Sequence, residues 1–102
     1  MVDFEEQRQG LIMILFPEQC RAARGLLNWT QAELATFAGI SRSTVRDFEG
    51  ERHQLHRSTE ALLISTLEKA GVRLLPPGRE GAGARLCKHR PFLLPPYVKA
   101  HE

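Results

Sequence analysis

The chain has 102 residues, a length that supports one small domain with short appendages. Apolar residues make up 42% of it and charged residues 25%, a balance that fits an ordinary globular protein and excludes a disordered chain. The net charge of +2 argues weakly for any partner, but residues 72–102 hold six lysine and arginine residues against two acids. Such a basic tail suits a polyanion partner or simple solubility, and the sequence leaves both open.

The first predicted element is the apolar run LIMILF, residues 11–16. Its lack of alternation predicts a strand that is covered on both faces. Six residues are too few for a membrane span, which needs roughly 20, and the acidic residues before the run do not suit a signal peptide. We therefore expect a cytoplasmic protein that does not contact membranes and keeps Cys20 and Cys87 reduced.

Two helices are predicted next. Pro17 suits the first position of a helix, and Cys20, Ala23 and Leu27 then recur at helical spacing. Phe16 would be the N-cap of this helix and offers no side-chain oxygen, so the start is poorly capped. The next helix has a clear start, because Thr30 and Glu33 form an S/T-x-x-E capping box.

The second helix ends where a third begins almost at once. Gly39 can take a positive φ at no steric cost, so it ends the second helix, and Ser41 can cap a third that runs to about residue 49 or 50. Two capped helices set this close must cross at a steep angle. The small side chains of Ala35 and Ala38 suit that close crossing, with Val45 filling the angle between the helices.

A fourth helix and a hairpin complete the predicted elements. Ser58 or Thr59 opens the helix STEALLISTLEKA, which places Leu63 and Leu67 on one face and stops at Gly71. Residues 72–75 and 84–87 flank a loop rich in proline and glycine, which predicts a small β-hairpin. The remaining residues contain three prolines and predict an extended tail.

Three short segments, QAELA at 31–35, AGIS at 38–41 and TV at 44–45, together resemble the helix-turn-helix of the Cro/repressor-type (XRE-like) regulators. The similarity runs from about residue 19 to residue 72. It implies a mainly α fold: a four-helix lambda-repressor-like domain with an N-terminal strand and a small C-terminal β-hairpin. The expected divisions are an N-terminal arm and strand (1–16), a helix-turn-helix DNA-binding domain (17–71), and a hairpin with a proline-rich basic tail (72–102).

In this family the second helix of the motif enters the major groove of DNA. The base-reading positions of relatives correspond here to Arg42, Ser43 and Asp47, and helical spacing also points Arg46 away from the core. Arg42 is the best single candidate, because its planar guanidinium can bond guanine O6 and N7 together. Asp47 either accepts from a cytosine amine or orients Arg42 or Arg46, and we favour the orienting role.

The resemblance also assigns residues to the DNA backbone and to the framework. The predicted backbone contacts, which position the protein without reading sequence, are Thr30, Gln31, Ser41, Thr44, Gln54 and Arg57. Arg24 and Glu49 match a buried ion pair between helices in relatives, so their predicted role is structural. After the third helix, relatives usually show Glu-x-Gly and then a proline. This chain has Glu51 in place of that glycine and Leu55 in place of the proline.

These residues predict a sequence-specific transcriptional regulator, a repressor more than an activator, that binds a double-stranded DNA operator as a homodimer. The dimer surface stays open, since the strand at residues 11–16 can pair with the hairpin of its own chain or across a two-fold axis. The alternative is an antitoxin-like or anti-activator module that holds a protein partner through the strand and hairpin region. We expect no metal, cofactor or enzymatic activity, because His53, His56 and Cys87 lack zinc-ligand spacing and no nucleophile motif is present.

Overall fold

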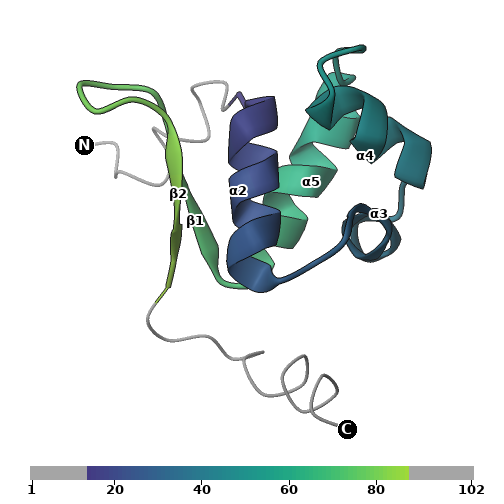
Figure 1. The fold of residues 1–102 in the computed structure, drawn as a ribbon, viewed down its shortest axis with the longest axis horizontal. Helices are drawn as coiled ribbons and strands as arrows, with labels where there is room; N and C mark the ends of the chain where they lie inside the picture. The colour runs from purple at the N-terminus through teal and green to yellow at the C-terminus, as the bar shows by residue number, and fades with distance from the viewer. Residues whose placement is uncertain (1–13, 88–102) are drawn as a thin grey trace, which may run out of the picture.

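The computed structural model describes residues 14–87, and in this part of the chain it contains four helices and one antiparallel sheet (Figure 1). The mainly α fold with a small C-terminal hairpin is confirmed. The elements in chain order are α2 (Pro17–Leu27), α3 (Gln31–Ala38), α4 (Arg42–Glu49), α5 (Arg57–Lys69), β1 (Val72–Leu75) and β2 (Gly83–Leu86).

The predicted strand at residues 11–16 lies partly outside the described residues, and residues 14–16 lead into α2 without regular secondary structure. The strand therefore stays a prediction. Leu15 is nevertheless buried, with 3% of its surface exposed, and its backbone N–H donates to Glu60 Oε2 at 2.8 Å. This bond fixes the chain entering α2 against α5.

The helix ends follow the predicted capping residues with one exception. Thr30 Oγ1 accepts from the backbone of Glu33, and Glu33 Oε1 accepts from the backbone of Thr30, so the capping box of α3 is confirmed. The exception is α5, which begins at Arg57 behind the extended residue His56 and not at Ser58 or Thr59. The carbonyl of His56 accepts from the N–H of Glu60, which is the first backbone hydrogen bond of the earlier start.

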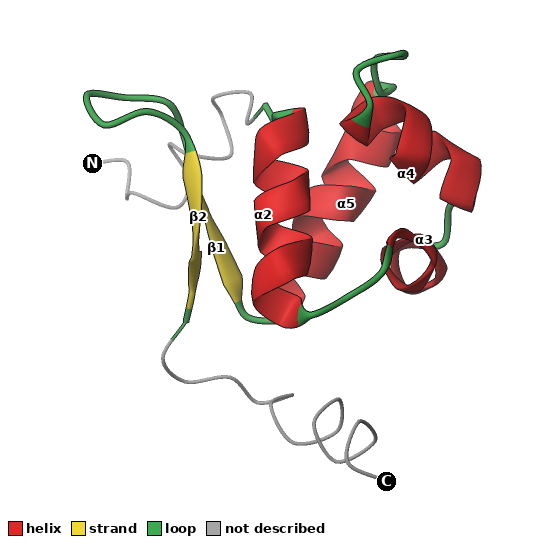
Figure 2. Cartoon of the chain, viewed as in Figure 1, coloured by secondary structure: helices red, strands yellow, loops and turns green. Residues whose placement is uncertain are grey.

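The apolar residues of all four helices and of β1 form one core. Leu34, Phe48 and Leu63 are buried, and Val45 has no exposed surface. Ala35 and Ala38 are buried where α3 meets α4, as the close crossing requires. The hairpin lies against α2 and α5 on one side of the molecule, while α3 and α4 lie on the other (Figure 2).

The hairpin packs on the helices through one of its two faces. Val72 pairs with Leu86 and Leu74 with Ala84, and all four side chains belong to the core or pack against it. The alternation of strand side chains then turns Arg73 and Arg85 outward, where both are exposed. The hairpin therefore has an apolar inner face and a basic outer face.

Gln19 joins the hairpin to the start of α2. Its side chain is buried, and its Nε2 donates to the carbonyls of Leu75 at 2.8 Å and of Gly83 at 3.0 Å. Its Oε1 accepts from the N–H of Phe16 at 3.0 Å. The side chain of Phe16 cannot cap α2, so Gln19 provides the side-chain hydrogen bond at the start of this helix. One buried amide thus satisfies three backbone groups from two parts of the fold.

Candidate nucleic-acid interface

The corner between α3 and α4 is built by a glycine followed by a serine. Gly39 has a φ of 76°, in the left-handed region that glycine adopts without strain, and ends α3 as predicted. The N–H of Ile40 then donates back to the carbonyl of Ala35 at 3.0 Å. Ser41 caps α4 by accepting from the N–H of Thr44 at 3.1 Å. The short turn therefore fixes how α4 is presented relative to α3.

Hydroxyl groups gather at the N-terminus of α4. Ser41 Oγ lies 3.1 Å from Ser43 Oγ and 2.7 Å from Thr44 Oγ1, and the two serines are exposed. The first backbone N–H groups of a helix lack intrahelical partners and carry a partial positive charge. This end of α4 therefore combines hydroxyl donors with the positive end of a helix dipole, a combination that suits phosphate oxygens.

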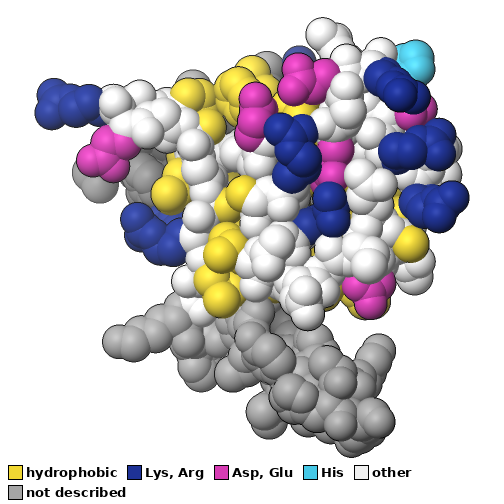
Figure 3. Space-filling model, viewed as in Figure 1, with side chains coloured by type: hydrophobic (Ala, Val, Ile, Leu, Met, Phe, Trp, Pro, Cys, Tyr) yellow, Lys and Arg dark blue, Asp and Glu magenta, His cyan; other side chains and the backbone are white. Residues whose placement is uncertain are grey.

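The outward side of α4 carries the predicted base-reading residues. Arg42, Ser43 and Arg46 are exposed, and Asp47 is half-buried. Arg46 Nε lies 3.4 Å from Asp47 Oδ1, so Asp47 contacts Arg46 and not Arg42. Positively charged side chains gather along the right-hand edge of Figure 3, where α4 and the loop after it lie, and in this segment all of them are arginines.

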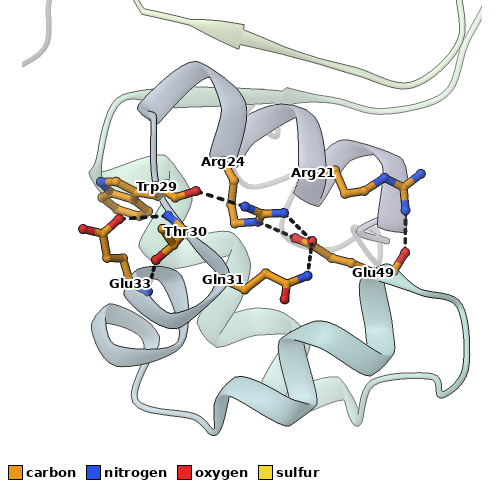
Figure 4. A network of polar contacts seen from close by, with 7 residues as sticks. All are labelled: Arg21, Arg24, Trp29, Thr30, Gln31, Glu33 and Glu49. Atoms are coloured by element: carbon orange, nitrogen blue, oxygen red, sulfur yellow. Dashed lines mark hydrogen bonds and ion pairs between the residues drawn. The ribbon is translucent and has the colours of Figure 1, made fainter.

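The inward side of α4 holds the framework that orients it. Val45, Phe48 and Glu49 are buried, and Glu49 is the acceptor for a cluster of donors (Figure 4). Arg24 donates to it through two nitrogens, from Nε to Oε2 at 2.8 Å and from Nη2 to Oε1 at 2.6 Å. This is the ion pair that the sequence predicted. Arg24 Nη1 also donates to the carbonyl of Trp29 at 3.0 Å.

Three further residues join this cluster and were not assigned to it from the sequence. Gln31 Nε2 donates to Glu49 Oε1 at 3.0 Å, and the buried thiol of Cys20 also hydrogen-bonds the Glu49 carboxylate. Arg21 Nη1 donates to the main-chain carbonyl of Glu49. The available signal was helical spacing, since Cys20 and Arg24 are four residues apart and share one face of α2.

The environment of this cluster shifts three pKa values. Burial opposes the charged form of Glu49, but hydrogen bonds from Arg24, Cys20 and Gln31 outweigh it and lower the pKa of the carboxyl. The hydrogen bond to Glu49 raises the pKa of the Arg24 guanidinium. Burial, together with the hydrogen bond to Glu49, raises the pKa of the Cys20 thiol, so this cysteine stays protonated and unreactive.

The structure places the predicted backbone contacts in two different environments. Gln31 is half-buried and held by Glu49, although its amide has a second hydrogen that can be donated elsewhere. Gln54 is exposed in the loop after α4, whereas Arg57 is the first residue of α5 and is also exposed. Arg52 is a further exposed arginine in this loop, and it was not among the predicted contacts. Its backbone N–H donates to the carbonyl of Asp47 at 2.8 Å.

The loop after α4 contains a strained residue. Glu51 has a φ of 61°, and it stands at the position where the family resemblance implies a glycine. A side chain in this left-handed conformation costs roughly 1–2 kcal/mol. Gly50 lies one residue too early to relieve it, since its own φ is −85°.

We expect Glu51→Gly to raise the free energy of unfolding by about 1 kcal/mol, because it removes the left-handed strain. Denaturant unfolding of the full chain measures the change. Glu51→Ala is the matched control, since it removes the same charge but keeps a Cβ. Equal stabilisation by alanine and glycine would show that charge, and not the backbone, sets the stability of this loop.

The corner, the capped α4 and its buried anchor coincide with a known motif. The helix-turn-helix family model matches residues 21–50, from the first half of α2 to the end of α4. The chain carries a helix-turn-helix of the Cro/repressor type. A comparison with curated proteins gave no match. Members of this helix-turn-helix family are DNA-binding regulators, and the match therefore supports DNA binding by this chain.

A metal site and a membrane span are two other features that residues 14–87 could contain. That part of the chain has no group of three or more histidine, cysteine, aspartate or glutamate side chains that could hold a metal ion. Its longest helix, α5, has 13 residues, and none of its helices has the length and apolar character that a membrane span requires.

Proposed function

We propose that the protein is a sequence-specific transcriptional repressor that places α4 in the major groove of a DNA operator. The observation that carries the proposal is the division of α4 into two sides. Glu49 and two apolar residues anchor one side in the core, and Arg42, Ser43, Arg46 and Asp47 occupy the other. A helix that is buried on one side and polar on the other, behind a tight turn, can enter a groove about 12 Å wide.

Arg42 is the proposed principal base reader. It is exposed in the first turn of α4, and it forms no ion pair with another described residue, so its guanidinium is available for the N7 and O6 atoms of guanine. Asp47 contacts Arg46, which supports the orienting role that the sequence favoured for it. The side chain of Ser43 is too short to form more than one hydrogen bond with a base.

The hydroxyl cluster and the residues after α4 are the proposed backbone contacts. Ser41, Thr44, Gln54 and Arg57 would fix the position of the domain on the duplex without reading sequence. We add Arg52 to this set because it is exposed in the same loop. We also propose a homodimer on a palindromic operator, whose half-sites would lie about one helical turn apart.

The experiment is a footprint of the full chain on the DNA upstream of its own gene, at low salt. Wild type should protect a palindromic segment, and Arg57→Ala should weaken protection equally on all sequences and lower the salt slope by about 1. Failure of the wild type to protect any segment, even at low salt, would reject the operator proposal. Sedimentation of the DNA-bound and free protein tests the dimer, and a monomer in both states would reject that part alone.

A further inference from the structure

The outer face of the hairpin places two positive charges directly opposite each other. The register pairs Arg73 on β1 with Arg85 on β2, and both side chains are exposed. Their strand neighbours Val72 and Leu74 are buried in the core, so the arginines project from the opposite face of the sheet. The hairpin turn adds a third exposed arginine, Arg79, next to the exposed acid Glu80.

This pair is unfavourable for folding. Like charges directly across an antiparallel pair destabilise the strands that carry them. Neither arginine forms an ion pair with another residue of the described part of the chain, where the ion pairs are Arg24–Glu49 and Arg46–Asp47. The outer face is therefore a concentrated positive site whose charge would be balanced by an external anion.

The basic face points away from the helix-turn-helix. The hairpin contacts α2 and α5, whereas α4 contacts α3 and α2, so the helical layer separates the hairpin from α4 (Figure 1). The inner face of the hairpin covers that layer, which leaves Arg73 and Arg85 on the far side of the molecule. A duplex bound along α4 cannot also lie on this face.

We propose that the outer face of the hairpin binds the phosphate backbone of a second DNA duplex, so that the protein bridges two DNA segments. The inference rests on the proposed function for the first duplex. Guanidinium groups form paired hydrogen bonds with phosphate. Arg73 and Arg85 are directly opposed in the register, where Cβ atoms lie roughly 5 Å apart, so both side chains can reach one phosphate or two neighbouring ones. DNA is the polyanion nearest to this face, because the helix-turn-helix already concentrates the protein on DNA. The contact reads no sequence, since it reaches only phosphates.

The test is a bridging assay with the full chain. A duplex containing the protected upstream segment is fixed to beads, and a labelled duplex of unrelated sequence is added at low salt. Wild type should retain the labelled duplex, and Arg73→Glu should abolish that retention while leaving the footprint on the upstream segment unchanged. In the wild type, the logarithm of the retention constant should fall with the logarithm of salt concentration with a slope of about −2, for two phosphate contacts.

Arg73→Glu also separates binding from folding. It converts the like-charge pair into an opposite-charge pair, so the melting temperature of this variant should be equal to or above that of the wild type. Arg85→Glu should reproduce both effects from the other strand. Retention that is absent in the wild type, or that persists in both variants, would overturn the second site. A wild type that leaves no footprint would instead reject the proposed function, so the two failures are distinguishable.

Discussion

Glu49→Ala should lower the free energy of unfolding by about 3–5 kcal/mol, a large part of the roughly 5–15 kcal/mol that a domain has in total. The reason is that Glu49 is the shared acceptor for Arg24, Gln31 and Cys20. Alanine would leave the Arg24 guanidinium without its counter-charge in a site where only 19% of that side chain is exposed. Urea unfolding of the full chain, followed by circular dichroism, measures the loss.

The neighbouring ion pair of α4 provides the control. Asp47 contacts Arg46 on the outward side, where 53% of the Arg46 side chain is exposed, so Asp47→Ala should cost less than about 1 kcal/mol. The double variant Arg24→Met/Glu49→Leu should recover much of the stability lost in Glu49→Ala, because it removes both charges and not one. Similar losses for Asp47→Ala and Glu49→Ala would contradict the anchoring role of Glu49.

The same ion pair predicts a pH dependence. The folded-state pKa of Glu49 is lower than its ordinary value, so its contribution to stability is present above the unfolded pKa of about 4.3 and is lost as pH falls through the folded pKa. The stability difference between wild type and Glu49→Ala should therefore shrink below about pH 4. A difference that stays constant down to pH 2 would show that Glu49 is not held as a carboxylate.

Gln19→Leu should lower the free energy of unfolding by about 1–3 kcal/mol, although leucine is similar in size and more apolar. The substitution removes the partner of three backbone groups, the N–H of Phe16 and the carbonyls of Leu75 and Gly83. Hydrogen exchange of the hairpin amides should accelerate more than exchange in α3, because Gln19 holds the hairpin and not the corner.

Gln19→Glu is the matched variant for this position. It keeps the acceptor for Phe16 but directs carboxylate oxygens at the carbonyls of Leu75 and Gly83. A protonated carboxyl can still donate to one of them, so this variant should recover stability relative to wild type as pH falls from 7 to 4. A Gln19→Glu variant as stable as the wild type at pH 7 would contradict the role assigned to the amide.

The corner was predictable because its signals are local. Thr30, Gly39 and Ser41 act on backbone groups within a few residues, so their sequence positions almost determine which bonds they form. The core was predictable for a related reason, since the apolar spacing of α2, α4 and α5 fixes which faces turn inward. The hairpin followed from the proline-glycine loop and the two short segments that flank it.

The remaining features depend on contacts between distant residues. Glutamine usually lies on the protein surface. Gln19 is buried because its side chain donates to two carbonyls that are 56 and 64 residues away in the sequence. Glu51 takes a left-handed conformation because the loop geometry imposes it, against the preference of its own side chain. Helix α5 begins at Arg57, earlier than predicted, because the extended residue His56 is its N-cap. Ser58 and Thr59 are better capping residues in isolation. These outcomes are set by tertiary packing, which overrides local preference.

The most direct measurement of the central claim is the sequence preference of Arg42→Ala. Binding of the full chain to its protected segment and to the same segment with each guanine replaced in turn gives a discrimination ratio. Wild type should discriminate at one guanine by about 1–3 kcal/mol, and Arg42→Ala should lose that discrimination at that position alone while still binding DNA. An Arg42→Ala variant that keeps the full preference of the wild type would contradict base reading by the N-terminus of α4.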